Sequence, residues 1–470
     1  MFPPLFVSFG YYVAFGLLVI VTANLILLRL RRKTLVGKPR VAFFHPNCNA
    51  GGGGERVLWC AINALQRRGI AECYVYSGEK NCKPEEIIRN AEKRFNISLS
   101  EKVHFVKLQL CPLLNASIYP RLTLLCQSIA GFIVGVEALL RFQPDVFIET
   151  TGFATTLCVF RLLLGCKTAC YIHYPTISTD MLQMVAEQRP SYNNDERVAN
   201  VKVLTQAKLL YYKALAWNYG WLGRKSADAI MVNSSWTKGH IIQLWRKPDS
   251  TYLVFPPCDF SKFSLLPLER EDDQLLTIVS VGQFRPEKDY PLTLRSFQRL
   301  LENISDSNLR RRVRLVMIGS CRGKSDQILL ENLQAMASQL GIDSQTDWKV
   351  DVSYDELRAS LGTAIAGIHT MWNEHFGIGI VEMMAAGVIV VAHNSGGPKM
   401  DIVRPYDDEV VGFLASSAEE YADALRNILL LSKSERMRIQ RAARKSTERF
   451  RTEMFENQFF NIFQNLCCLR

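Results

Sequence analysis

Two short motifs place residues that suit the chemistry of a nucleotide-activated sugar. In Gly-Gln-Phe-Arg-Pro-Glu-Lys, which begins at Gly282, Arg285 and Lys288 follow an apolar run and could bind a diphosphate. In Glu-His-Phe-Gly-Ile-Gly-Ile-Val-Glu, Glu374 and Glu382 stand eight residues apart, and carboxylates are strong acceptors for sugar hydroxyls. Either motif alone is typical of a solvated surface. Together they predict one site for a sugar and its diphosphate.

A run of four glycines lies between the apolar run 41–45 and a helical pattern that opens at Glu55. Without Cβ atoms the backbone can approach a ligand closely, and the helix N-terminus that follows offers free N–H groups. The run is neither a dinucleotide fingerprint nor a Walker loop, and a plain flexible turn is the alternative. We expect a loop that binds phosphate or acceptor. Its residues are Gly51, Gly52, Gly53, Gly54, Glu55 and Arg56.

His173 ends the apolar run 169–174. A satisfied core histidine is the usual alternative, but the carboxyl end of a strand favours a role in a cleft. Asn394–Pro398 is a second glycine turn that could donate backbone N–H groups to phosphate. The chain has no Asp-x-Asp motif, so we expect no metal site. The diphosphate charge would then be neutralised by Arg285, Lys288 and helix termini.

The elements that must position these residues alternate along the chain. Continuous apolar runs are typical of buried parallel strands, and strand–helix alternation predicts doubly wound α/β sheets with ligands at the carboxyl ends of the strands. The predicted strands are 41–45, 73–77, 103–108, 146–149, 168–173, 230–233, 277–281, 314–318, 366–370 and 388–393. The predicted helices are near 55–68, 121–141, 153–164, 197–224, 235–244, 290–302, 325–340, 378–386 and 418–431, followed by a helical, basic tail.

Two α/β domains facing a cleft are therefore expected, because 470 residues exceed one ordinary core and a proline-rich, charged stretch interrupts the alternation. The expected parts are a membrane anchor with a basic juxtamembrane segment (1–37), a first Rossmann-like domain (38–260), a linker (261–275), a second Rossmann-like domain (276–432) and a helical tail (433–470).

Bulk composition is that of a globular protein, with 48% apolar and 21% charged residues. The net charge of +11 suits acidic lipid or phosphorylated substrates, and no nucleic-acid-binding signature is present. The 13 cysteines include no Cys-x-x-Cys pair, which indicates free thiols in a reducing compartment.

The N-terminus predicts a single transmembrane helix. The segment Leu5–Leu28 has no charged residue and would span about 36 Å. Basic residues from Arg29 onward place the body of the chain in the cytosol, and a cleavable signal peptide is the weaker alternative. Two further segments, 122–140 and 209–221, are either interfacial helices or core-packed helices, and the sequence leaves both possibilities open.

Together these motifs resemble the retaining GT-B glycosyltransferases marked by a Glu-x7-Glu element. Within them, the match is closest to the α-1,2-mannosyltransferase family of the dolichol pathway, which adds the fourth and fifth mannoses to the lipid-linked oligosaccharide on the cytosolic face of the endoplasmic reticulum. The segments that carry the resemblance are His45–Trp59, Asn233–Thr237, Gly282–Lys288, Glu374–Glu382 and Ala392–Pro398.

The resemblance implies that the second domain binds GDP-mannose. The implied donor-binding residues are Gln283, Arg285, Lys288, Glu374, Phe376, Gly377, Ile378 and Glu382. Lys288 matches the family's phosphate-binding lysine. Gln283 stands where the family usually has an arginine, so Arg285 is expected to take that role.

Roles in the reaction are implied as well. Glu374 would contact mannose hydroxyls and Glu382 the ribose, while His173 would reach the mannose from the opposite domain. Gly53 and Gly54 would lie near the reacting centre. The implied catalytic set is His173, Glu374, Arg285 and Lys288. The implied mechanism is front-face transfer without a covalent nucleophile or a metal cofactor.

The implied partners are GDP-mannose, the dolichyl-pyrophosphate-linked oligosaccharide, the endoplasmic reticulum membrane and other mannosyltransferases of the same pathway. Three alternatives stay open. One is the sibling enzyme that adds earlier mannoses, and another is a non-catalytic, membrane-anchored protein that binds sugar nucleotides. The third, a nucleotide-dependent epimerase or dehydrogenase, lacks its glycine fingerprint.

Overall fold

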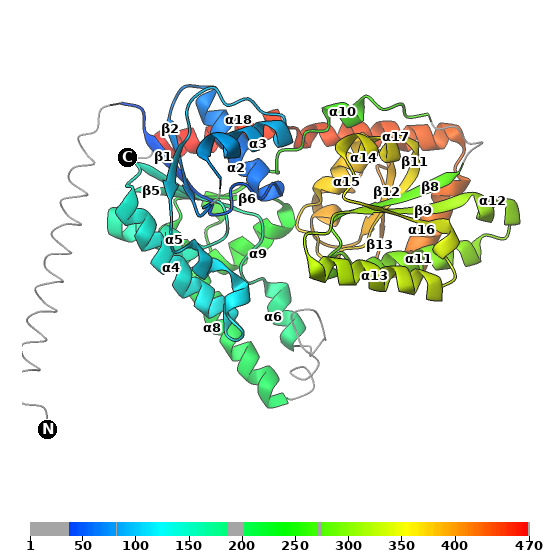
Figure 1. The fold of residues 1–470 in the computed structure, drawn as a ribbon, viewed down its shortest axis with the longest axis horizontal. Helices are drawn as coiled ribbons and strands as arrows, with labels where there is room; N and C mark the ends of the chain where they lie inside the picture. Colours follow the sequence, from blue (N-terminus) through cyan, green and yellow to red (C-terminus); the bar gives the residue numbers. More distant parts are fainter. Residues whose placement is uncertain (1–36, 81, 187–201, 270–274, 469–470) are drawn as a thin grey trace, which may run out of the picture.

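The computed structural model describes residues 37–80, 82–186, 202–269 and 275–468. Two parallel sheets lie next to each other along the long axis of the molecule, each covered by helices (Figure 1). The predicted membrane span at 5–28 lies outside the described residues.

The first sheet has seven parallel strands in the order β3-β2-β1-β4-β5-β6-β7. Its strands are β1 (Arg40–Phe44), β2 (Glu72–Ser77), β3 (His104–Lys107), β4 (Val146–Glu149), β5 (Lys167–Ile172), β6 (Ala229–Val232) and β7 (Thr251–Leu253). Its helices are α2 (Gly53–Gln66), α3 (Pro84–Phe95), α4 (Thr123–Arg141), α5 (Ala154–Cys158), α6 (Thr179–Ala186), α8 (Lys202–Ser226) and α9 (Ser235–Trp245).

The second sheet has six parallel strands in the order β10-β9-β8-β11-β12-β13. They are β8 (Leu276–Val281), β9 (Val313–Gly319), β10 (Thr346–Val350), β11 (Ala364–His369), β12 (Ile389–His393) and β13 (Phe413–Ala415). Its helices are α10 (Ser261–Ser264), α11 (Tyr290–Asn303), α12 (Ser307–Arg312), α13 (Lys324–Gln339), α14 (Tyr354–Thr363), α15 (Ile378–Ala385), α16 (Ala418–Leu430) and α17 (Lys433–Ser446). The last helix, α18 (Thr452–Cys468), packs on the first sheet. In both sheets the strand order reverses beside the first strand, which is where doubly wound sheets bind ligands.

All ten strands predicted from apolar runs are present, with small shifts at their ends. Three strands were missed: β7, β10 and β13, each at the edge of a sheet. These three strands are short and partly exposed, so they lack the continuous apolar run that marks a buried strand; β10, for example, has one buried residue, Thr346. The predicted helix 153–164 is also irregular, because α5 continues from Val159 as a π-helix.

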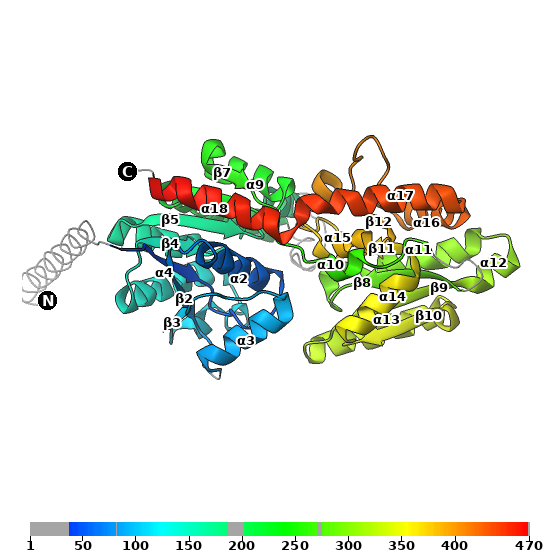
Figure 2. The same ribbon diagram turned by 90° about the horizontal axis from the view of Figure 1, so that it is seen from above.

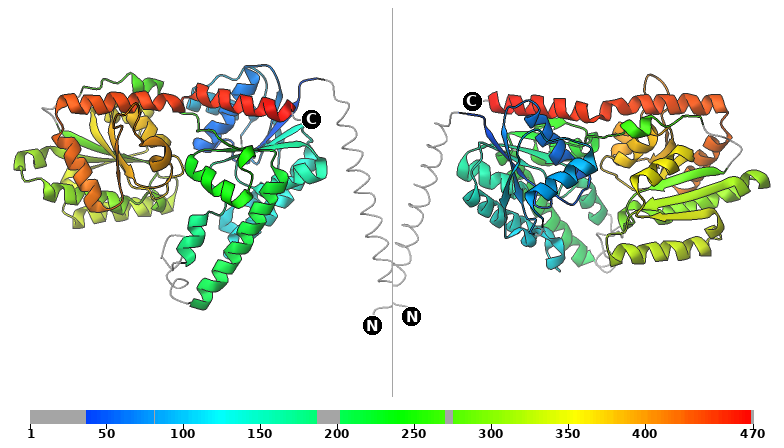
Figure 3. Two further views of the ribbon diagram at one scale, coloured as in Figure 1. Left: turned by 180° about the vertical axis from the view of Figure 1, so that it is seen from behind. Right: turned by 45° about the horizontal axis from the view of Figure 1, so that its top comes forward.

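The C-terminal helices connect the two halves of the molecule. Helix α17 packs on the second domain and α18 crosses back to lie along α2, so that the two helices form a nearly straight rod over both sheets (Figures 2 and 3). Phe455, Phe459 and Phe463 of α18 enter the core beneath the first sheet, where the Phe459 ring stacks 6.5 Å from that of Phe43. The chain end therefore completes the core of the first domain.

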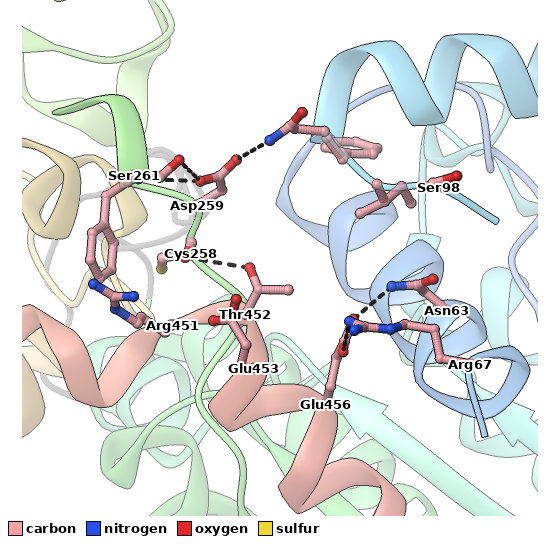
Figure 4. A pocket seen from close by; sticks show the side chains of 14 residues that line it. Asn63, Arg67, Ser98, Cys258, Asp259, Ser261, Arg451, Thr452, Glu453 and Glu456 are labelled. Carbon is pink, nitrogen blue, oxygen red and sulfur yellow. Dashed lines mark hydrogen bonds and ion pairs between the residues drawn. The ribbon is translucent and has the colours of Figure 1, made fainter. Parts of the chain in front are cut away.

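A polar cavity of about 370 Å³ marks the junction between linker, α2 and α18 (Figure 4). Asn63 donates to Glu456 at 2.8 Å, and Arg67 pairs with the same carboxylate at 3.4 Å. On the other side Asn96 donates to Asp259 at 3.3 Å. None of the motif residues lines this cavity within the described parts of the chain, so it belongs to the domain junction.

Candidate active site

The cationic loop lies where the strand order of the second sheet reverses. It follows β8, closes with a 3-10 turn (Pro286–Lys288) and leads into α11. Asp289 takes φ +48°, and its side chain accepts a hydrogen bond from the N–H of Leu292 at 3.3 Å. This cap ends the turn directly after Lys288, whose side chain lies over the carboxyl ends of the strands.

Lys288 and Glu374 form a close ion pair at that edge. The Lys288 Nζ lies 2.6 Å from Glu374 Oε2, and His369 Nε2 lies 3.1 Å from the same oxygen. Burial alone would raise the pKa of Glu374, but the charge of Lys288 and the hydrogen bond of His369 outweigh it and hold the pKa well below its ordinary value. The carboxylate is therefore charged, neutralised and fixed in direction.

His369 was not singled out by the motifs, although it ends a buried strand as His173 does. Burial lowers its pKa, so the ring is neutral and its Nε2 hydrogen is the group that can bond to a carboxylate. The position of a histidine at the carboxyl end of a strand was the signal that could have found it.

Arg285 and Gln283 lie outside this cluster. The Arg285 guanidinium is over one third exposed and lies 3.7 Å from Glu287. Gln283 contributes its backbone carbonyl, which accepts a hydrogen bond from the hydroxyl of Tyr290 at 3.0 Å. The structure thus brings Lys288 to Glu374, the first of the two spaced acids, and leaves Arg285 at the surface of the same loop.

The residues between the two acids form the N-terminus of α15. Gly377 caps this helix with φ +110°, a conformation that favours glycine, and the helix begins at Ile378. The ring of Phe376 is buried against Phe255 and Phe450, so its backbone is the part that a ligand could reach. The first N–H groups of a helix have no partner within it and can bind an anion.

Glu382 lies one turn into α15 and faces a different space. It lines a cavity of about 890 Å³ between the two sheets, together with Gly51, Arg56 and Tyr354. Burial raises the pKa of Glu382, and the nearby Arg56 acts in the opposite direction. The Nη1 of Arg56 is buried and has no hydrogen-bond partner among the described residues. Glu374 and Glu382 therefore face different parts of the cleft.

The glycine run brings the first domain against α15. Helix α2 begins at Gly53, two residues before the predicted start, so the last two glycines form its first turn. A Cβ added at Gly53 would lie 3.2 Å from the side chain of Ile378 across the cleft. At Gly51, where φ is +75°, it would collide with the guanidinium of Arg94. Gly53 is thus favoured by close approach to the second domain, and Gly51 by its positive φ, because the exposed Arg94 side chain can move aside.

His173 reaches the same place from β5. Its Nε2 is buried, has no hydrogen-bond partner among the described residues, and would lie 3.6 Å from a Cβ added at Gly54. Burial, aided by the neighbouring His45, lowers the pKa of His173 to about 4. The imidazole is therefore neutral, and its free nitrogen can exchange a hydrogen bond with a ligand.

His45 is a second residue that the motifs did not assign. Its Nδ1 lies 2.8 Å from the hydroxyl of Thr150, whose own hydrogen bonds to the carbonyl of Phe44, so His45 must donate. Its Nε2 lies 3.2 Å from Glu55 Oε1. Burial raises the pKa of Glu55, but the bond and charge of His45 outweigh it and the pKa is lowered. This pair fixes the first turn of α2.

Polar contacts close the cleft beside the acids. Asn373 donates to Asp180 at 2.7 Å, the backbone N–H of Ser235 donates to Asp401 at 2.8 Å, and the rings of His375 and Tyr174 are 4.3 Å apart. The segments after β11 and β12 therefore contact α6, α9 and the loop after β5 in the first domain.

No group of three or more His, Cys, Asp or Glu side chains is placed to hold a metal ion within the described ranges. The expected metal independence stays a prediction.

Two family models match successive parts of the chain. The model described as ALG11 mannosyltransferase N-terminus matches residues 38–245, and the model described as Glycosyl transferases group 1 matches residues 267–446.

Curated relatives cover nearly the whole chain. Those from Xenopus laevis and Homo sapiens, both named GDP-Man:Man(3)GlcNAc(2)-PP-Dol alpha-1,2-mannosyltransferase, are 46% and 45% identical. The first covers 97% of this chain and 94% of the relative, and the second covers 96% and 93%. The chain belongs to this mannosyltransferase family. The resemblance predicted from the motifs is thereby confirmed.

Solved structures show that this mannosyltransferase has the predicted GT-B fold. An OtsA apo structure matches with a TM-score of 0.65 at 12% identity, covering 92% of this chain and 100% of the other. Sucrose-phosphate synthase from Thermosynechococcus elongatus matches with a TM-score of 0.64 at 16% identity, with the same coverage. At such identities the likeness concerns the fold alone.

Proposed function

We propose that the chain transfers mannose from GDP-mannose, in α-1,2 linkage and with retention, to the dolichyl-pyrophosphate-linked oligosaccharide, adding its fourth and fifth mannoses. The names of the full-length relatives support this donor and this acceptor. The observation that carries the proposal is the buried cluster of Lys288, Glu374 and His369, which offers a cation and a directed carboxylate side by side.

The donor diphosphate binds over the loop after β8. Lys288 neutralises Glu374 when no donor is bound, so an arriving diphosphate competes for the lysine and leaves Glu374 Oε2 free to accept from a mannose hydroxyl. The backbone of Gly377 and Ile378 at the start of α15 adds N–H groups, and Arg285, at the surface of the same loop, adds a weaker charge that solvent screens.

The nucleoside lies toward the larger cavity. Glu382 accepts from the ribose hydroxyls there, which suits an acid that faces a space of about 890 Å³ rather than a fixed cation. In this division residues 276–432 hold the donor, and residues 38–260 present the acceptor.

Transfer occurs on one face of the sugar. As the bond from mannose to phosphate breaks, Lys288 and the α15 N-terminus stabilise the charge on the departing phosphate. The acceptor 2-hydroxyl attacks the same face and passes its proton to that phosphate, so no enzyme nucleophile is needed. Neutral His173 hydrogen-bonds the mannose, and the glycines at 53 and 54 leave room for the reacting centre.

The reaction takes place at the cytosolic face of the endoplasmic reticulum membrane. The apolar segment 5–28 and the basic residues after it support a single-pass anchor, and a dolichol-linked acceptor requires a membrane. A complex with other mannosyltransferases of the pathway would pass the lipid between active sites.

The deciding experiment combines purified full-length protein, GDP-mannose and a defined trimannosyl lipid-linked acceptor. We expect two α-1,2-linked mannoses in the product, and we expect turnover to persist with a chelator. Mannose added only to shorter acceptors would identify the sibling activity instead. Donor binding without transfer would identify a non-catalytic sugar-nucleotide binding protein.

A further inference from the structure

A cavity of about 260 Å³ lies among α4, α5 and α8, the helices gathered at the lower end of the first domain in Figure 1. Most of its lining is apolar and includes Leu124, Leu215 and Leu222. The space opens to the protein surface, and a concave pocket with a mostly apolar lining is the usual form of a ligand site.

The cavity abuts the active site. Tyr174 lines it and follows His173 directly in the chain, at the carboxyl end of β5. The Tyr174 ring also contacts His375 of the second domain, at a centroid distance of 4.3 Å. A ligand in the cavity can therefore extend into the cleft where His173 points.

Charge and hydrogen bonding exclude a phosphate as the occupant. Of the described residues that line the cavity, none is Lys, Arg, Asp or Glu. The backbone N–H groups of Thr151 and Gly152 already donate to the carboxylate of Glu149, at 2.7 Å and 2.8 Å. The apolar part of the lining fits a hydrocarbon, and the hydroxyl of Thr155, which is buried without a hydrogen-bond partner among the described residues, can meet one polar group of the same ligand.

The outer faces of the same helices are apolar and exposed. On α4 the exposed residues follow one stripe, and on α8 they recur at spacings of seven and four, so each set lies on one helical face. These residues are Leu122, Ile129, Ile133 and Leu140 on α4, and Leu210, Trp217 and Trp221 on α8. Leu140 is 76% exposed and Trp217 73%.

Basic side chains accompany the tryptophans, since Lys213 and Arg224 lie on the exposed side of α8. Tryptophan beside lysine or arginine is typical of a surface at the membrane interface. Helix α4 is also long and apolar enough to cross a membrane, as some core helices of soluble proteins are. Only a third of its apolar stretch is buried. The exposed apolar residues therefore lie on the same two helices that line the cavity.

We propose that this cavity receives the isoprene units of the acceptor lipid nearest its pyrophosphate, which enter between α4 and α8 from the membrane. The proposal rests on the proposed function for the lipid-linked nature of the acceptor. It assigns the polyprenyl chain to α4, α5 and α8, and leaves the pyrophosphate and glycan to the cleft.

Photolabelling tests the site without requiring turnover. The full-length protein in detergent is irradiated with a polyprenyl diphosphate that carries a diazirine on its second isoprene unit and no glycan. We expect labelled peptides from α4 and α8, and about tenfold less labelling in Ser128→Phe, which fills the cavity. Asn218→Trp, at an exposed position on the cavity rim, is a second variant that should show the same loss of labelling. The test therefore does not depend on whether Ser128→Phe folds.

The control is Leu140→Gln on the same helix, outside the cavity, which weakens membrane contact but keeps the labelling. Labelling elsewhere in the chain, or labelling of both cavity variants as strong as in wild type, overturns the proposal. Absence of mannose transfer by a wild-type protein that is labelled on α4 and α8 would instead refute the proposed function, so the two failures are distinguishable.

Discussion

Glu374 carries three interactions in the absence of a substrate, with Lys288, with His369 and with the backbone N–H of His375 at 3.2 Å. A buried carboxylate needs such partners, because burial without them would favour its neutral form. The same contacts direct one oxygen toward Lys288, where phosphate and sugar must meet. Stability and substrate binding therefore use the same side chain.

Lys288→Met is expected to lower kcat/KM by about 10²–10³-fold, the usual cost of removing one preorganised charge-stabilising group. Arg285→Met is the matched control in the same loop. Its exposed side chain is expected to contribute on the order of 1 kcal/mol or less, which is a loss of at most about fivefold. Steady-state kinetics with both substrates measures the two effects, and thermal melting checks the fold. An equal loss of kcat/KM in both variants would mean that Arg285 contributes as much to the donor site as Lys288 does.

His173 predicts a pH dependence of stability. Its pKa is about 4 in the folded chain against an ordinary 6.5, so between these values the unfolded chain binds a proton that the folded chain does not. Stability from the neutral ring is thus present above the unfolded pKa and is lost as pH falls toward 4. From about pH 7 to about pH 5 wild type should lose about 2 kcal/mol more unfolding free energy than His173→Asn. Denaturant titrations at both pH values test this, and parallel losses would mean that the ring is already protonated.

At the scale of elements, two helix N-termini meet across the cleft. Helix α2 begins with Gly53 and Gly54, and α15 begins at Ile378. The side chain of Ile378 would lie 3.2 Å from a Cβ added at Gly53. Both helices start at the carboxyl ends of strands, so both present free N–H groups and a positive dipole end to the same space. An anionic donor and an anionic acceptor lipid would both be attracted to this position.

Gly54→Ala is expected to reduce turnover without destabilising the chain. The new Cβ would meet His173 at ordinary contact distance, and alanine suits a helix better than glycine by about 1 kcal/mol. Yet the methyl group occupies the space before the free His173 nitrogen. Gly51→Ala is the contrasting variant: its positive φ is strained for alanine and should lower the melting temperature as well. Melting curves beside kinetics separate the two, and full activity of Gly54→Ala would show that no ligand enters there.

At the scale of the whole molecule, α18 joins the chain end to the first domain. Its phenylalanines pack beneath the first sheet, and Glu456 bonds to Asn63 of α2. Because α17 packs on the second domain and α18 on the first, these consecutive helices join the two domains at one side. Contacts such as the hydrogen bond from Asn373 to Asp180 join them at the other side. The cleft between them is therefore bounded on both sides.

Phe459→Ala is expected to cost about 3–5 kcal/mol, because its ring is 2% exposed and removal leaves a cavity. The loss should appear in the first domain, although residue 459 follows the second domain in sequence. Hydrogen exchange should therefore speed up in β1 and α2 and stay unchanged in β8 and α11. Exchange that accelerates in the second domain instead would contradict this assignment. Met454→Ala, at an exposed position of the same helix, serves as the control.

Much of this protein follows from its sequence because the signals are local. Continuous apolar runs marked every buried strand, since a strand covered on both faces tolerates few polar residues. The glycine run and the Glu-x7-Glu element follow such strands, and these local signals are enough to indicate a GT-B glycosyltransferase. Three of the four edge strands, β7, β10 and β13, were not predicted, because they are short and partly exposed to solvent.

Tertiary structure decided which side chains meet. Lys288 and Glu374 are far apart in sequence, and their spacing could not show that they form one ion pair while Arg285 stays at the surface. The roles of His369 and His45, and the return of α18 to the first core, depend on contacts between distant segments as well. Sequence patterns report burial along one element, whereas charge pairing and cavity shape arise where several elements converge.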